Sequence, residues 1–213
     1  MELIINKNET KNVVLLNSTE EQIRIVQNEE SSICVHFIDI FPQTVHVSRN
    51  VVVEQVGKNS TVQLFAMGYL QQNQQINFVS NVLHNCPWGH SEQLLKYVLT
   101  DTASFSFLGK VYVAPNAQKI VAQQTNKNIL LSPQAKVQTQ PQLEIYADDV
   151  VCNHGSSTGQ IDSEALWYMQ ARGIDKITAT KLLVGSFAND VLEKISDEKI
   201  QTFIGEKITE KLV

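Results

Sequence analysis

Cysteine is scarce in this 213-residue chain, which has only Cys34, Cys86 and Cys152. An odd number of cysteines argues against a disulfide framework and indicates reduced thiols. No Cys-x-x-Cys pair is present, so a self-contained zinc site is not predicted. The first residues also lack the basic segment and apolar run of a secretory signal, and a cytoplasmic location is therefore expected.

Long apolar runs and basic clusters are missing as well. No run reaches the roughly 20 residues that span a bilayer, so no membrane association is expected. The net charge is -5 and no large basic patch is present, which argues against binding to nucleic acid. There is no G-x-S-x-G, P-loop or glycine-rich dinucleotide motif, so any nucleotide-driven role requires a partner that binds the nucleotide.

Short β-branched runs dominate the first 150 or so residues. Many alternate apolar and polar residues, which is typical of strands with one face in a core. No amphipathic helix of ten residues separates them, which excludes βαβ units. The predicted strands are residues 12–16, 22–26, 33–38, 44–47, 51–56, 75–82, 92–99, 104–108, 111–114, 119–123 and 142–146.

Two mainly β architectures fit these strands, a sandwich or barrel and a parallel β-helix. Residues 57–62, 114–120 and 131–137 are polar turns with a small residue, each followed closely by an aliphatic residue. Tight corners with stacked aliphatic residues inside favour the solenoid of a parallel β-helix over residues 1–158. The spacing of the runs is irregular, and the sandwich remains open on the residues alone.

The pattern becomes helical over residues 159–213. Asp162 is the expected N-cap of a helix that ends before Gly173. A second helix is predicted to begin at Thr178, and a third to run from the acidic cap at residues 196–198 to Leu212. Two roles for this tail are open and are not exclusive: it caps the open end of the solenoid, or it presents an apolar face to a partner.

Cys152 and His154 form the first of three thiol–imidazole pairs. If a strand continues through them, they project from the same face, with Cβ atoms roughly 6.5–7 Å apart. Thiolate and neutral imidazole suit iron, copper or zinc. Two ligands do not complete a site, so the others would come from a neighbouring coil or another subunit. On spacing alone, a buried thiol and a turn histidine before Gly155 are the favoured interpretation of the pair.

The other candidates have simpler structural explanations. Cys86 and His90 flank a Pro-Trp-Gly sequence that describes a packed turn, with His84 just before it. Cys34 and His36 lie within an apolar strand and are interpreted as structural. The adjacent carboxylates at residues 148–149 follow a strand and are expected to form a corner.

The segments around Cys152 resemble the SufB/SufD family of iron–sulfur cluster assembly proteins, and within it the SufD branch. The likeness covers roughly residues 85–195, and the matching segments occur in the family's order. They are residues 123–132 (QQTNKNILLS), 141–150 (PQLEIYADDV), 152–155 (CNHG), 159–162 (GQID) and 166–174 (LWYMQARGI).

The resemblance implies a right-handed parallel β-helix followed by a small C-terminal helical region. It implies a non-catalytic scaffold subunit that pairs through its β-helix with a SufB-like subunit, or with a second copy, and binds a SufC-like ATPase through its helices. No cofactor is expected to be bound stably by the chain alone. Iron or an iron–sulfur cluster is expected transiently at the interface between subunits.

The resemblance also implies roles for individual residues. His154 matches the family's interface histidine, and Cys152 is its neighbouring cysteine. SufB proteins have a cysteine near the segment that corresponds to Lys127 and Asn128, where this chain has none, which favours SufD. The residues expected to bind the ATPase partner are Trp167, Tyr168, Arg172, Gly173, Leu182, Leu183 and Phe187.

Two other functions are compatible with a β-helix. A structural β-helix homodimer would leave the thiols and imidazoles inert. A polysaccharide-active β-helix enzyme would need clustered carboxylates, and the sequence offers only the pair at residues 148–149. In one respect the chain departs from the family, whose members have a helical domain before the β-helix, whereas predicted strands begin here almost at once.

Overall fold

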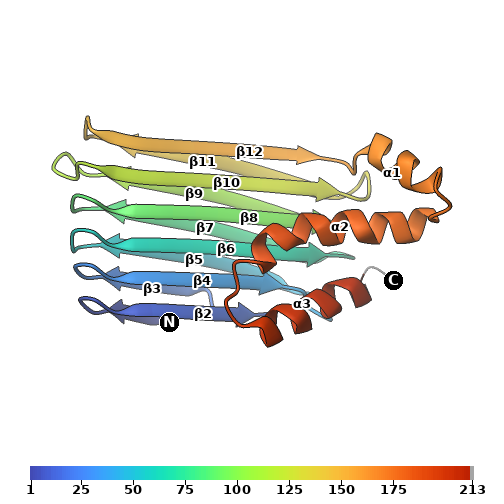
Figure 1. The fold of residues 1–213 in the computed structure, drawn as a ribbon, viewed down its shortest axis with the longest axis horizontal. Coiled ribbons are helices and arrows are strands. Elements are labelled where there is room, and N and C mark those ends of the chain that lie inside the picture. The colour runs from blue at the N-terminus through green and yellow to red at the C-terminus, as the bar shows by residue number, and fades with distance from the viewer. Residues whose placement is uncertain (212–213) are drawn as a thin grey trace.

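The computed structural model describes residues 1–211, over which twelve strands are followed by three helices (Figure 1). The strands are β1 (Glu2–Ile5), β2 (Thr10–Leu16), β3 (Gln22–Gln27), β4 (Ser32–Asp39), β5 (His46–Gln55), β6 (Thr61–Leu70), β7 (Gln75–His84), β8 (His90–Leu99), β9 (Ser104–Val113), β10 (Ile120–Leu130), β11 (Lys136–Ile145) and β12 (Val150–Gly159). The helices are α1 (Ser163–Gln170), α2 (Lys176–Leu192) and α3 (Glu198–Lys211).

The strands form two parallel six-stranded sheets. One sheet has the order β1-β3-β5-β7-β9-β11, and the other has the order β12-β10-β8-β6-β4-β2. Paired residues come from successive coils: Thr61 pairs with Ser32 on one side and with His90 on the other. Each coil gives one strand to each sheet, and apolar side chains from both fill the lumen between them. The predicted parallel β-helix is therefore confirmed, and the antiparallel sandwich is excluded.

The predicted strands were too short or incomplete in several places. Residues 44–47 and 51–56 belong largely to one strand, β5, and residues 104–108 and 111–114 to β9. β1 and β6 were not predicted at all, and β12 was predicted only as a conditional continuation of a strand through Cys152 and His154. Most of β6 is buried on both faces, one in the lumen and one beneath helices, so its sequence lacks the alternation that marks a half-buried strand.

The corners between β-strands at one end of the coils use left-handed backbone. Asn59 has a φ of 57° and Trp88 a φ of 64°. The N–H of Asn59 donates to the carbonyl of Pro87 at 3.1 Å, and that of Trp88 donates to Gln118 at 2.9 Å. Each corner thus hydrogen-bonds to the corner of the next coil, which is the stacking that the predicted polar turns require.

The predicted helices are present with small shifts at their ends. The Asp162 carboxylate accepts hydrogen bonds from two backbone N–H groups of α1, as expected for an N-cap. Gly173 has a φ of +84°, a left-handed conformation suited to ending a helix. α2 begins at Lys176 rather than Thr178, because Asp175 is its N-cap. The predicted end of the third helix, Leu212, lies outside the described residues.

α2 and α3 pack on the outer face of the sheet that contains the even-numbered strands (Figure 1). Val184, Ala188 and Val191 of α2 and Ile204 and Ile208 of α3 are buried against this sheet. The tail therefore covers one side of the solenoid, and the alternative in which it caps the open end is wrong. Along residues 1–211, no helix is both long enough and apolar enough to cross a membrane.

Candidate functional site

The last strand of the solenoid, β12, brings Cys152 and His154 onto one face. It pairs with β10 on one side, in a register that places Cys152 beside Ala122 and His154 beside Gln124. No other strand of the described chain pairs with its second edge. A strand does continue through both residues, so the turn at His154 that the spacing alone favoured is wrong.

Both side chains face the lumen at its open end. Ala122 and Gln124 are each 1% exposed and point into the lumen, and side chains in register on parallel strands share a direction. Cys152 and His154 point the same way, but β12 is the final coil and no further coil covers them. Cys152 is consequently half-buried and His154 is exposed.

This geometry supplies two soft or borderline metal donors at an open edge. Burial raises the pKa of the Cys152 thiol, so the protonated form is favoured until a metal or a cation approaches. Among the described residues, no group of three or more His, Cys, Asp or Glu side chains is arranged to hold a metal ion. Cys152 and His154 can therefore provide part of a coordination sphere, to be completed by other donors.

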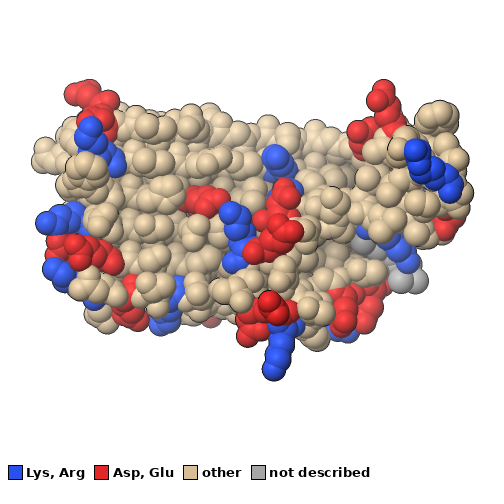
Figure 2. All heavy atoms as spheres, viewed as in Figure 1, with Lys and Arg blue, Asp and Glu red and all other residues tan. Residues whose placement is uncertain are grey.

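The edge around this pair is uncharged. β12 contains no Lys, Arg, Asp or Glu, and Figure 2 shows a largely tan strip along the β12 edge of the molecule. Charged residues gather instead at the corners and on the helices. An uncharged strand edge with free N–H and C=O groups can pair with another strand, and burying it removes no charge from water.

The pair formed by Cys34 and His36 is buried beneath the segment between α2 and α3. The Cys34 Sγ lies 3.7 Å from His36 Nδ1, and the two residues are 8% and 2% exposed. Burial raises the pKa of Cys34 to about 12 and lowers the pKa of His36 to about 4. A neutral thiol against a neutral imidazole agrees with the structural interpretation of this pair.

Cys86 lies in a turn, as predicted, and His90 begins β8 directly after it. The Cys86 Sγ contacts the carbonyl oxygen of Val56 at 2.9 Å. His84 points into the lumen, where its Nε2 lies 2.9 Å from the hydroxyl of Ser91. The thiol and the imidazole therefore have separate partners and do not converge on one point.

The remaining candidates near the site are structural. Asp149 forms the predicted corner, where its carboxylate pairs with Lys119 and its backbone N–H donates to Gln118. Lys127 points outward from β10, whereas Asn128 is buried and donates to Thr158 at 3.2 Å. The adjacent carboxylates of residues 148–149 thus serve the corner of the coil.

The expected partner-binding residues divide into two groups. Trp167, Tyr168 and Leu182 are 71%, 54% and 50% exposed. Trp167 and Tyr168 line a hollow on α1 together with Leu183 of α2. Phe187 instead packs toward β8, with its ring centroid 4.3 Å from the Lys96 Nζ. An unpredicted apolar residue, Ile177, is 66% exposed at the start of α2.

Two further tail residues shape this exposed region. The Arg172 guanidinium carbon lies 3.6 Å from the centroid of the Tyr168 ring, which holds the ring against the end of α1. Gly173 permits the left-handed turn that leads from α1 to α2. Arg172 therefore contacts one of the exposed aromatic rings, whereas Gly173 shapes the turn, and both residues are themselves exposed.

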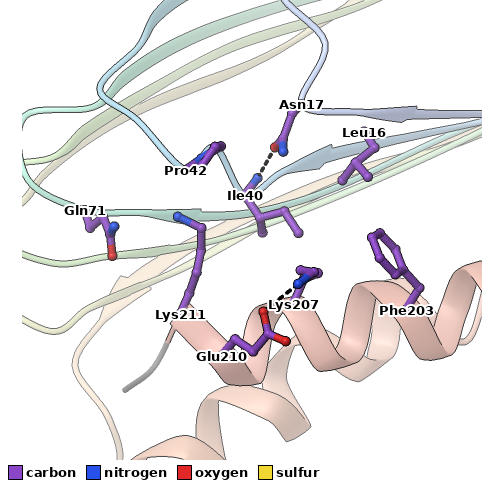
Figure 3. Close-up of a pocket in the computed structure, with 9 residues that line it drawn as sticks. All are labelled: Leu16, Asn17, Ile40, Pro42, Gln71, Phe203, Lys207, Glu210 and Lys211. Atoms are coloured by element: carbon purple, nitrogen blue, oxygen red, sulfur yellow. Dashed lines mark hydrogen bonds and ion pairs between the residues drawn. The ribbon is translucent and has the colours of Figure 1, made fainter.

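A second hollow, of about 690 Å³, lies between α3 and the first coils (Figure 3). Leu16, Ile40 and Phe203 give it an apolar wall. Its two lysines already have oxygen partners, since Lys207 pairs with Glu210 at 2.7 Å and Lys211 donates to the carbonyl of Phe41. The hollow is at the opposite end of the stack from β12 and contributes nothing to the Cys152–His154 edge.

Comparison with known proteins gives the same family as the sequence segments. Residues 2–187 match the family model described as "SUF system FeS cluster assembly, SufBD core domain". The Escherichia coli iron–sulfur cluster assembly protein SufD is 34% identical over 163 residues, which are 76% of this chain and 38% of that protein. Protein ABCI7 of Arabidopsis thaliana chloroplasts is 35% identical over 153 residues, 71% of this chain and 32% of that protein.

A third relative is the SufBD family protein slr0076 of Synechocystis, 33% identical over 152 residues, which are 71% of this chain and 34% of that protein. The chain thus spans about a third of the length of the curated relatives it matches. The family model, however, covers all twelve strands, α1 and most of α2. The chain therefore belongs to the SufBD core family of the SUF iron–sulfur cluster assembly system and is similar to its SufD members.

Proposed function

We propose that this chain forms the core of a non-catalytic SufD-like scaffold subunit for iron–sulfur cluster assembly. In this proposal it pairs with a SufB-like subunit through the open end of its solenoid and binds a SufC-like ATPase through its helices. The observation that carries the proposal is the free, uncharged β12 edge with His154 and Cys152 on its lumen face. Family membership and relatives named as iron–sulfur cluster assembly proteins support it.

The β12 edge suits the pairing step. A strand from a partner can hydrogen-bond to the free backbone groups of β12 and extend the sheet. The partner's own side chains would then lie about 4.8 Å from the row that contains Cys152 and His154. Donors from two subunits would together surround iron or a nascent cluster, which is the substrate of assembly and is passed on.

The helical tail suits the ATPase step. Trp167 and Tyr168 are large aromatic side chains exposed beside one hollow, and residues of this kind often dominate the binding energy of an interface. α2 connects this region to the solenoid through buried contacts with β6 and β8. A force applied to α1 and α2 would therefore be transmitted to the coils that contain β6 and β8, below β12.

The cluster site is tested by replacing His154 with alanine in the protein that carries this chain. The assay is rescue of iron–sulfur enzyme activity in cells that lack their own SufD. We expect loss of rescue, because the imidazole donor is removed. Asn153→Ala is the matched control, since Asn153 is an exposed neighbour on the opposite face of β12. Full rescue by His154→Ala would contradict the site and favour a purely structural dimer.

ATPase binding is tested by replacing Trp167 with alanine and measuring capture of the purified ATPase subunit. We expect at least a tenfold weaker interaction, which is typical of an aromatic anchor. Phe203→Ala is the control, because Phe203 is a 46% exposed aromatic residue on α3, away from the α1 hollow. Equal binding by the wild type and the Trp167 variant would contradict this docking surface.

A further inference from the structure

A polar layer crosses the apolar lumen just beneath His154. The Ser80 hydroxyl of β7 donates to Gln93 Oε1 of β8 at 2.7 Å. In the next coil, Gln124 of β10 is in register with Gln93, and His154 of β12 is in register with Gln124. Gln93, Gln124 and His154 thus form a column, with neighbouring strands about 4.8 Å apart.

The amides of this column are not satisfied by the rest of the chain. Gln93 and Gln124 are each 1% exposed. Within residues 1–211, Gln93 Nε2 and both amide atoms of Gln124 have no hydrogen-bond partner. Buried amide groups rarely remain unpaired, because each costs about 1–3 kcal/mol. In register along the column, Gln124 lies between Gln93 and His154.

The absence of a side chain at Gly109 leaves space for the Gln124 amide. A Cβ atom at Gly109, on the opposite strand β9, would lie 2.4 Å from Gln124 Nε2. Any larger residue at Gly109 would therefore displace the amide. Glycine here lets the Gln124 side chain extend across the lumen, directly below the coil that carries His154.

The same chain contains an enclosed version of this column in its other sheet. Gln27, Gln55 and His84 are in register on β3, β5 and β7, and all three are fully buried. Gln55 Nε2 donates to Gln27 Oε1 at 3.1 Å, which is an amide ladder between coils. Gln55 Oε1 and His84 Nδ1 lie 2.5 Å and 2.7 Å from the position of a Cβ atom at Gly89. Within residues 1–211 these two atoms also lack a hydrogen-bond partner, so the amide–imidazole step is left open in this column as well.

We propose that Gln124 is a positioning residue that holds the imidazole of His154 by an amide–imidazole hydrogen bond. The inference rests on the proposed function, in which His154 is the metal donor that Gln124 positions. In the column, Gln124 Oε1 accepts the N–H of one ring nitrogen. The lone pair of the other nitrogen is then directed out of the lumen, toward the open end.

The ladder below Gln124 can support this arrangement. With its amide oriented in this way, Gln124 Nε2 donates to Gln93 Oε1, and Gln93 Nε2 donates to the Ser80 hydroxyl. A hydroxyl both donates and accepts, so Ser80 ends the ladder in either orientation. A metal-ligating histidine commonly donates its second N–H to such a partner, which fixes the tautomer and the ring orientation.

The tautomer of His154 provides the test. Long-range 1H–15N correlation spectra of the 15N-labelled chain report which ring nitrogen carries the proton, and a His154→Asn variant identifies its signals among the five histidines. We expect one dominant tautomer in the wild type. Gln124→Met has a similar length without the amide, and it should change the tautomer ratio about tenfold, the value of one hydrogen bond.

Two further variants make the result specific. Gln124→Glu keeps an acceptor oxygen and should retain the wild-type tautomer. Gln123→Met changes an exposed outward residue of the same strand and should have no effect. Unchanged His154 signals in Gln124→Met would overturn the inference, as would an equal change in Gln123→Met. If Gln124→Met does not fold, loss of the wild-type tautomer in Gln124→Glu would overturn it.

Cluster assembly separates this inference from the proposed function. Loss of the positioning partner should lower the assembly rate by about 10–100-fold, whereas Gln124→Glu should keep it. If His154→Ala retains assembly while Gln124→Met shifts the tautomer, the proposed function is wrong and the hydrogen bond stands. If His154→Ala abolishes assembly and Gln124→Met leaves the tautomer unchanged, the proposed function stands and the role of Gln124 is wrong.

Discussion

Replacing Arg49 with methionine should destabilise the solenoid by about 3–5 kcal/mol, because it leaves a carboxylate buried without a cation. Both side chains of the Arg49–Asp39 pair are 0% exposed. Two guanidinium nitrogens donate to the two carboxylate oxygens at 2.9 Å each. The Tyr97 hydroxyl donates to the same carboxylate at 2.6 Å. In the variant, Tyr97 would be the remaining side-chain partner of a charge sealed in the lumen.

The magnitude can be separated into steps. Arg49→Met with Asp39→Leu removes the unpaired charge, so most of the loss should return. The Tyr97 hydroxyl would then lack its acceptor, which costs about 1–3 kcal/mol. Adding Tyr97→Phe removes this last buried polar group, and the triple variant should lie within about 1.5 kcal/mol of the wild type if the lumen repacks. Stability should therefore increase from the single to the double to the triple variant.

Guanidinium unfolding followed by circular dichroism measures this order. In a thermal scan, a loss of 3–5 kcal/mol corresponds to a fall in Tm of about 6–20 °C for a chain of this size. A single variant destabilised by less than about 1 kcal/mol would show that the buried carboxylate is tolerated or protonated. A triple variant no more stable than the single variant would show that packing around Phe37 and Phe78, rather than charge, dominates this site.

Three further predictions concern single residues. Trp88 has left-handed backbone, which asparagine tolerates better. Trp88→Asn should therefore raise the free energy of unfolding by about 0.5–1 kcal/mol, measured as a higher denaturant midpoint, and a lower midpoint would contradict this. Burial lowers the pKa of His36 from 6.5 to about 4. The unfolded chain therefore binds a proton first as the pH falls, and stability should decline between about pH 6.5 and 4, less steeply in His36→Gln; equal slopes would refute this. Burial raises the pKa of Cys34 to about 12, so iodoacetamide at pH 8 should label it far more slowly than the partly exposed Cys86 in peptide mass spectra, and equal rates would be the contrary result.

Half-buried strands and capped helices could be predicted because their signals are local. The alternation in residues 104–108 and the N-cap at Asp162 each depend on neighbours a few positions away. β6 was missed because α2 covers its outer face, and the covering residues lie more than a hundred positions further along the chain. Burial on both faces removes the polar residues whose spacing would have marked the strand.

The candidate site could be predicted only in part. Resemblance to the family identified Cys152 and His154, but spacing alone did not separate them from Cys34 and His36, which have the same separation in sequence. The structure separates them by depth, because Cys34 and His36 are buried under the tail whereas the lumen face of β12 is uncovered. Gln124 lies in a segment that resembles the family, residues 123–132, but its position beneath His154 could not be predicted, since its neighbour in the column is thirty residues away.

The amino-acid sequence by itself determined that this chain is a run of strands followed by helices, and which family it resembles. β-branched runs, polar corners and capping carboxylates act over a few residues, so each can be recognised from a short segment of the sequence. The tertiary structure alone decided which side chains meet. Parallel coiling brings residues from successive coils into register. That register places His154 at the open end of a buried amide column, whereas His36 and His84 are buried.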